Sequence, residues 1–123
     1  PNVKLKINER LEKYNNIKLL KPLDYPNLVY LMKHAKLILS DSGGIQEEAP
    51  TFGCPTLVMR YETERIEGIE AGVSSLVGAD FDKIIEQSSN ILSKPKSETR
   101  LQVKNPYGDG KSSQRIIKII NEF

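Results

Sequence analysis

Apolar residues recur along the chain in two patterns, one with helical spacing and one in short continuous runs. Helical spacing predicts helices over residues 3–11, 26–34, 44–52, 65–71, 81–92, 97–103 and 112–122. The short apolar runs between these segments predict four strands, over residues 17–20, 37–39, 55–59 and 74–77. Because helices and strands alternate, we expect an α/β fold, a Rossmann-like parallel sheet with helices on both faces, in three layers.

Local signals mark several helix ends. Asp80 precedes the helix over 81–92 and can cap its first amides, Gly53 favours the end of the helix over 44–52, and Pro26 suits a first turn. The last predicted helix carries a stripe of isoleucines, which we expect either in the core or against another domain: Ile116, Ile117, Ile119 and Ile120.

Composition narrows the classes of function. A chain of 123 residues corresponds to a single small domain, residues 1–123. One cysteine, Cys54, and one histidine, His34, exclude a disulfide framework and a cysteine-rich or histidine-pair metal site, so we expect no metal. The net charge of +2 does not favour nucleic-acid binding, and no apolar run approaches the ~18 residues of a membrane span.

Charge and glycine are unevenly distributed. Residues 42–80 contain two Lys/Arg against seven Asp/Glu and hold six of the eight glycines, whereas both flanking segments are basic. This pattern is typical of a loop-rich functional face. We therefore look for a site at the loops that follow the predicted strands, because ligands of open parallel sheets bind beyond the carboxyl ends of the strands.

The strongest candidate follows the strand predicted at 37–39. Gly43 and Gly44 let the backbone approach a ligand closely, Ser42 adds a hydroxyl donor, and the amides of the following helix favour a phosphate or diphosphate. Glu48 lies one helical turn beyond Gly44 and could accept both hydroxyls of a ribose. The alternatives are that Ser42 only caps a helix after a tight turn, and that Glu47 and Glu48 only stabilise its first turn.

Two further segments need interpretation. Arg65 follows the strand at 55–59 and could reach the phosphates, although a solvated turn with local Glu–Arg pairs is an equal alternative. The end of the 105–113 segment imitates a phosphate-binding P-loop, but Asn105 stands where the first glycine is required. We expect the loop from Asn105 to Gly110 to make consecutive turns and to cap the last helix.

Taken together, the segments 41–50, 63–65, 72–78 and 105–110 resemble those of the non-hydrolysing UDP-N-acetylglucosamine 2-epimerases, with matching order and spacing. The resemblance implies two Rossmann-like domains in the glycosyltransferase-B arrangement, with the active site in the cleft between them. It covers the carboxyl-terminal half, so we expect this chain to be one domain of a larger enzyme.

The resemblance also implies roles for individual residues. Ser42, Gly43 and Gly44 match the turn that holds the UDP diphosphate, Glu48 matches the carboxylate on the ribose, and Arg65 matches an arginine on the nucleotide. Where the family often has a glutamine and an aromatic residue near uracil, this chain has Leu23 and Leu28. Tyr25 is the nearby alternative for stacking on the base.

The function implied is the UDP-holding half of an enzyme that interconverts UDP-GlcNAc and UDP-ManNAc, by elimination and readdition of UDP, without a cofactor. The catalytic acid and base would belong to the amino-terminal domain, so we expect no catalytic residue here and no activity from the isolated chain. A cytoplasmic location, a homodimeric full-length enzyme and a role in polysaccharide synthesis are also implied. The alternatives are a donor-binding subunit of a two-chain glycosyltransferase and a non-catalytic UDP-sugar-binding module.

Overall fold

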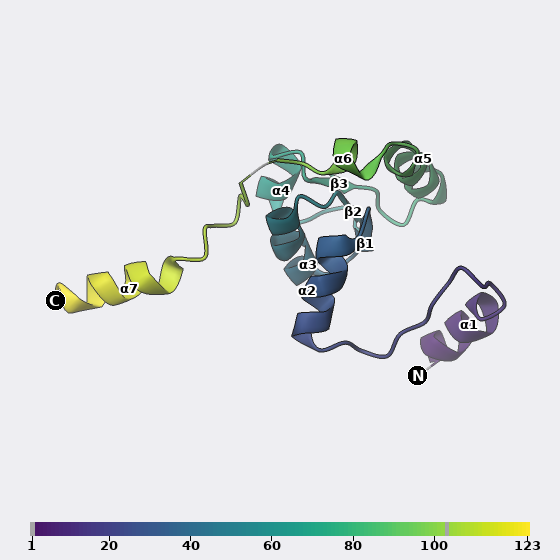
Figure 1. Cartoon of the computed structure of the whole chain (residues 1–123), viewed down its shortest axis with the longest axis horizontal. Coiled ribbons are helices and arrows are strands. Elements are labelled where there is room, and N and C mark those ends of the chain that lie inside the picture. The colour runs from purple at the N-terminus through teal and green to yellow at the C-terminus, as the bar shows by residue number, and fades with distance from the viewer. Residues whose placement is uncertain (1, 103) are drawn as a thin grey trace.

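A parallel sheet of three strands forms the centre of the protein (Figure 1). The computed structural model describes residues 2–102 and 104–123. The strands are β1 (Ile38–Ser40), β2 (Thr56–Val58) and β3 (Ser74–Leu76), in the order β1-β2-β3. Leu39 of β1 lies opposite Leu57 of β2, which lies opposite Ser75 of β3. The expected α/β fold with a parallel sheet is therefore confirmed.

Helices connect and flank the strands, and most of them lie close to their predicted positions. They are α1 (Asn2–Leu11), α2 (Tyr25–His34), α3 (Gly43–Glu48), the 3₁₀ helix η1 (Ala49–Phe52), α4 (Ile66–Glu70), α5 (Phe81–Leu92), α6 (Lys96–Thr99) and α7 (Ser112–Asn121). The helix predicted over 44–52 is thus α3 continued by η1. It ends at Gly53, whose φ of 60° is left-handed, as expected. The Asp80 carboxylate accepts the amide of Lys83 and caps α5, also as expected.

The core is centred on β2. Thr56, Leu57 and Val58 are all buried. Because successive side chains of a strand point to opposite faces, three consecutive buried residues mean that both faces of the sheet are covered. Residues beside the strands complete this core: Met32, Ala49, Cys54, Val73 and Val77.

The fourth predicted strand, over 17–20, is wrong. These residues have no regular secondary structure, and the side chains of Ile17, Leu19 and Leu20 are 38%, 41% and 61% exposed. A strand forms only when its backbone groups pair with a neighbour. Within the described residues β1 pairs only with β2, and the 17–20 segment is not paired with any strand.

Two other predictions need correction. The helix expected over 97–103 is the shorter α6, and Val103 lies outside the described residues. The isoleucines of α7 are not core, because they are 55–64% exposed and Figure 1 shows α7 at the end of an extended segment, away from the sheet. Docking of this stripe on another domain stays a prediction. No helix in the described part of the chain is long and apolar enough to cross a membrane.

Candidate nucleotide-binding site

The loops after β1 and β2 leave the sheet at the same edge, because both strands run in the same direction. The first loop enters α3 at Ser42, which occupies the N-cap position with extended backbone angles. Its amide donates to Oγ of Ser40, whereas its own hydroxyl makes no capping hydrogen bond to α3. The side-chain capping that we kept as the alternative role for Ser42 is therefore not observed.

Arg65 of the second loop lies directly against Gly43. A Cβ atom added to Gly43 would lie 2.7 Å from Cζ of Arg65 and 2.9 Å from its Nη2. A real Cβ atom does not come this close to another heavy atom unless one of them moves. The guanidinium therefore packs directly on the backbone of Gly43, in space that a side chain would occupy. The structure thus brings together two candidates that are 22 positions apart in the sequence, and only glycine allows this approach at position 43.

Two carboxylates hold the other nitrogens of this guanidinium. Nε of Arg65 lies 2.9 Å from Oε1 of Glu47, and Nη1 lies 2.8 Å from Oε2 of Glu64. Of the local Glu–Arg pairs that we considered as an alternative, the pair with Glu64 is present, whereas Glu47 lies 18 positions away on α3. Both ion pairs leave Nη2 without a hydrogen bond to any residue that the structure describes, although Nη2, like Nε, would lie 2.9 Å from a Cβ atom on Gly43. Because the side chain is 32% exposed, this nitrogen can act on an anion at the start of α3.

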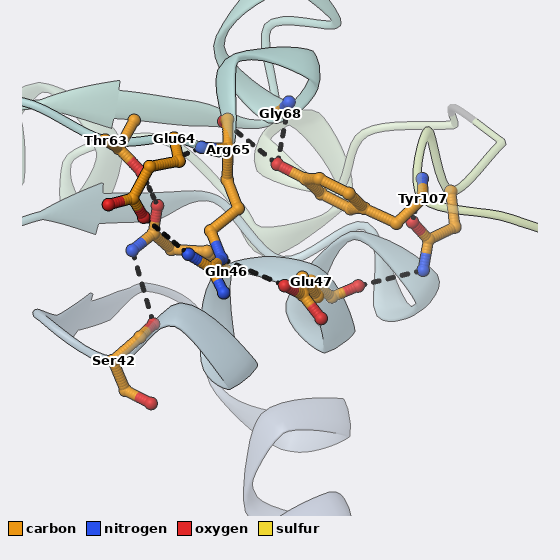
Figure 2. Close-up of polar contacts among 9 residues, drawn as sticks. Ser42, Gln46, Glu47, Thr63, Glu64, Arg65, Gly68 and Tyr107 are labelled. Carbon is orange, nitrogen blue, oxygen red and sulfur yellow. Dashed lines mark hydrogen bonds and ion pairs between the residues drawn. The ribbon is translucent and has the colours of Figure 1, made fainter.

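A buried glutamine connects the two loops (Figure 2). Gln46 is 1% exposed, donates from Nε2 to the carbonyl of Ser42 at 3.3 Å, and accepts a 2.8 Å hydrogen bond from Oγ1 of Thr63. Oγ1 of Thr63 in turn accepts the amide of Arg65. Sequence reasoning missed both Gln46 and Thr63, although an amide side chain four residues after Ser42, and so one helical turn from it, is a signal that could have indicated a polar bridge.

The 105–110 segment reaches back to this site and also contacts the start of α7. Nδ2 of Asn105 donates to the carbonyl of Glu47 and to Oγ1 of Thr51, while Oδ1 accepts the amide of Tyr107. The Tyr107 hydroxyl donates to the carbonyl of Arg65. One turn is present, because the Gly108 amide donates to the Asn105 carbonyl at 3.3 Å. Lys111, the N-cap residue of α7, makes no side-chain capping bond. Asp109 of the loop instead accepts the Lys111 amide and pairs with Arg115 of α7, so the loop holds the start of α7 through Asp109. Asn105 and Tyr107 are the second pair that the sequence did not reveal.

Glu48, the candidate for the ribose, contacts Tyr25, the candidate for the base. The Tyr25 hydroxyl donates a 2.7 Å hydrogen bond to Oε2 of Glu48 and links the start of α2 to the end of α3. This hydrogen bond and the negative charge of Glu48 raise the pKa of the Tyr25 phenol above its ordinary value. Both side chains remain accessible to solvent, so the pair can meet a ligand.

The two leucines expected near the base lie in different surroundings. Leu23 precedes α2 and is 40% exposed. Leu28 lines a cavity of about 240 Å³ between α2, β1 and α3, together with Leu31, Leu39 and Ile45. Within the described residues, no group of three His, Cys, Asp or Glu side chains is placed to hold a metal ion.

Comparisons with known proteins agree with the resemblance seen in the sequence. Residues 1–121 match the family model for UDP-N-acetylglucosamine 2-epimerase. The UDP-N-acetylglucosamine 2-epimerase of Yersinia pestis is 47% identical over 121 residues, which are 98% of this chain and 32% of that protein.

Solved structures show the same similarity in three dimensions. The UDP-GlcNAc 2-epimerase of Neisseria meningitidis, bound to UDP-GlcNAc, is 41% identical with a TM-score of 0.85, and the match covers 100% of this chain and 34% of that one. S. aureus MnaA, in a structure with UDP, is 36% identical with a TM-score of 0.89 over 99% of this chain and 33% of that one. The glycosyltransferase-B-like fold class is thus confirmed. The chain spans about a third of the length of the curated relatives it matches, their carboxyl-terminal part, and it belongs to the UDP-N-acetylglucosamine 2-epimerase family.

Proposed function

We propose that the carboxyl edge of the sheet binds the UDP part of UDP-GlcNAc within an enzyme that interconverts UDP-GlcNAc and UDP-ManNAc. The observation that carries this proposal is the packing of the Arg65 guanidinium on the Gly43 backbone at the start of α3. It places a cation, free helix amides and an unused serine hydroxyl at one spot, which suits a diphosphate. The ligands named for the Neisseria and S. aureus structures, UDP-GlcNAc and UDP, support the same ligand class here.

The proposed subsites follow the axis of α3. Ser42, Gly43 and Gly44 hold the diphosphate, and Arg65 offsets its charge. Glu48 lies four residues beyond Gly44, about 6 Å along the helix axis, and accepts the ribose hydroxyls. Uracil would then lie near the start of α2, beside Tyr25, Leu23 and Leu28.

The proposed chemistry is elimination followed by readdition. The C2–H bond of the sugar breaks and its proton goes to a base, while the C1–O bond breaks and UDP leaves with the electron pair, giving a glycal. Proton return to the opposite face of C2 and readdition of UDP at C1 give the epimer. Oxidation states are unchanged overall, so no redox cofactor is needed. Arg65 and the α3 amides stabilise the negative charge that develops on departing UDP.

The acid and base of these proton transfers are proposed to lie on the amino-terminal domain of the same enzyme. We infer that this chain alone holds UDP without turning over UDP-GlcNAc, that the full enzyme is a homodimer, and that it works in the cytoplasm. Incubating the isolated chain with UDP-GlcNAc and following UDP-ManNAc by chromatography tests the first point. Steady turnover would contradict the need for a second domain.

Titration of UDP into the wild type and the Glu48→Ala variant tests the binding proposal. Loss of a charge-assisted hydrogen bond to the ribose is expected to weaken binding by about 1–3 kcal/mol. Glu70→Ala, an exposed glutamate on α4, serves as the matched control and is expected to bind as the wild type does. Equal affinities of the wild type and Glu48→Ala would remove Glu48 from the site.

A further inference from the structure

The first turn of α4 is closed by a residue from a distant segment. Arg65 is the N-cap residue of α4, and its side chain makes no capping hydrogen bond. A guanidinium has no acceptor atom, so it cannot receive the free amides at the start of a helix. The Tyr107 hydroxyl takes over this role, because it accepts the Gly68 amide at 2.9 Å and donates to the Arg65 carbonyl at 3.0 Å (Figure 2).

The same segment also fixes the acidic partner of Arg65. Nδ2 of Asn105 donates to the backbone carbonyl of Glu47 at 3.0 Å, and the Asn105 carbonyl oxygen accepts the amide of Tyr107 at 2.9 Å. Glu47 in turn receives Nε of Arg65. Tyr107 and Asn105 therefore hold both the backbone of Arg65 and the residue that orients its guanidinium.

The Tyr107 hydroxyl packs closely against the backbone of Gly68. A Cβ atom on Gly68 would lie 2.7 Å from this oxygen and 3.2 Å from Oγ of Ser74. Burial also raises the pKa of Tyr107, so the phenol stays protonated and can donate and accept at the same time. A phenylalanine would fill the same space without either hydrogen bond.

We propose that Tyr107 is a positioning residue for the diphosphate subsite, because its hydroxyl joins the Arg65 carbonyl to the Gly68 amide and so fixes the backbone from which the Arg65 side chain reaches Gly43. This inference rests on the proposed role of Arg65 in UDP binding. Tyr107 itself does not touch the ligand and affects UDP binding only through Arg65.

A double-mutant cycle on UDP binding tests the inference. Kd values are measured by calorimetry for the wild type, Tyr107→Phe, Arg65→Ala and the double variant. We expect Tyr107→Phe to weaken binding about tenfold in the wild type and to have no effect in the Arg65→Ala background. Equal loss in both backgrounds, or no loss in either, would overturn the proposal. Tyr30→Phe is the control, because Tyr30 is an exposed tyrosine on α2 whose ring stacks on His34.

A ligand-free measurement separates this inference from the proposed function. The Arg65 Nε–H signal in a nitrogen–proton NMR spectrum is assigned by its absence from Arg65→Lys. We expect its exchange with water to be slow in the wild type and in Tyr30→Phe and faster in Tyr107→Phe, because the Glu47 pairing loosens. Unchanged exchange in folded Tyr107→Phe overturns the positioning role. Failure of the wild type to bind UDP, with the NMR change present, refutes only the proposed function.

Should Tyr107→Phe not fold, Gly68→Ala displaces the hydroxyl while keeping it in the chain. The same cycle and the same NMR signal then apply, with the same expected and contradicting results.

Discussion

The Tyr25 hydroxyl donates a 2.7 Å hydrogen bond to Oε2 of Glu48. This contact places an exposed aromatic ring beside the carboxylate proposed for the ribose. Base and ribose are neighbours in a nucleotide, so the contact favours Tyr25 as the residue that stacks on uracil. It also restrains the Glu48 side chain in the absence of ligand, because a carboxylate held by one donor keeps its second oxygen in a defined place.

The Tyr25–Glu48 contact predicts a pH dependence. The pKa of the Tyr25 phenol is raised in the folded protein, first by its hydrogen bond to Glu48. The contact therefore stabilises the fold fully below the ordinary phenol pKa, and this stabilisation is lost as pH rises through the pKa of folded Tyr25. In Glu48→Gln the negative charge is gone, and we expect the pKa of Tyr25 to fall towards its ordinary value. Titration of the Tyr25 ring carbon by NMR measures this change, with Glu70→Gln as the control. The same pKa in the wild type and Glu48→Gln would refute the contact.

Gly43 is predicted to be essential for the position of Arg65. A methyl group there meets Cζ of Arg65 at 2.7 Å, so Gly43→Ala is expected to push the guanidinium away and to weaken UDP binding about tenfold or more. In the Arg65→Ala background the same substitution is expected to cost little, because the colliding atoms are absent. Calorimetric Kd values for the four proteins check this. A loss of the same size in both backgrounds would show that Gly43 acts without Arg65.

At Gly44, unlike Gly43, an added methyl group is expected to stabilise the protein. The nearest atom to an added Cβ is Oγ of Ser42 at 3.9 Å, so Gly44→Ala fits without strain inside α3. We expect the free energy of unfolding to rise by about 0.5–1 kcal/mol, since alanine loses less backbone entropy than glycine in a helix. Urea unfolding followed by circular dichroism measures it, and a decrease would contradict the described packing.

Leu57 and Ile119 differ in burial, so their truncation is expected to affect stability differently. Leu57 of β2 is 2% exposed, and Leu57→Ala is expected to lower the free energy of unfolding by about 2–5 kcal/mol. Ile119 of α7 is 55% exposed, and Ile119→Ala is expected to change it by no more than about 0.5 kcal/mol. Urea unfolding of both variants tests this contrast. A large loss from Ile119→Ala would mean that the α7 stripe packs on the rest of this chain.

Local patterns in the sequence predicted most of the fold. The bounds of α5 follow from an amphipathic run and the capping side chain of Asp80, both of which act within a few residues. The segment 17–20 has an equally good strand pattern, yet it forms no strand. Pairing depends on a neighbouring backbone that the segment's own residues do not specify.

Residues of the candidate site could be proposed from the sequence where they lie within one segment. Ser42, Gly43, Gly44 and Glu48 share one turn and helix, so spacing alone related them. The Asn105 and Tyr107 contacts join segments about forty to sixty positions apart, and no local pattern encodes such pairings. That Arg65 could reach a phosphate at the start of α3 followed from the strand ends, but the hydrogen bonds of the Tyr107 hydroxyl to Arg65 and Gly68 could not be predicted.

The most direct test of UDP binding at the carboxyl edge of the sheet is a titration of UDP into the isotope-labelled chain, followed through its backbone amide signals. We expect the largest shifts at Gly43, Gly44, Glu48 and Arg65, saturating with a single Kd. Shifts confined to the cavity at the opposite edge, lined by Thr56, Val73 and Asn90, or no saturable shifts at all, would contradict the account.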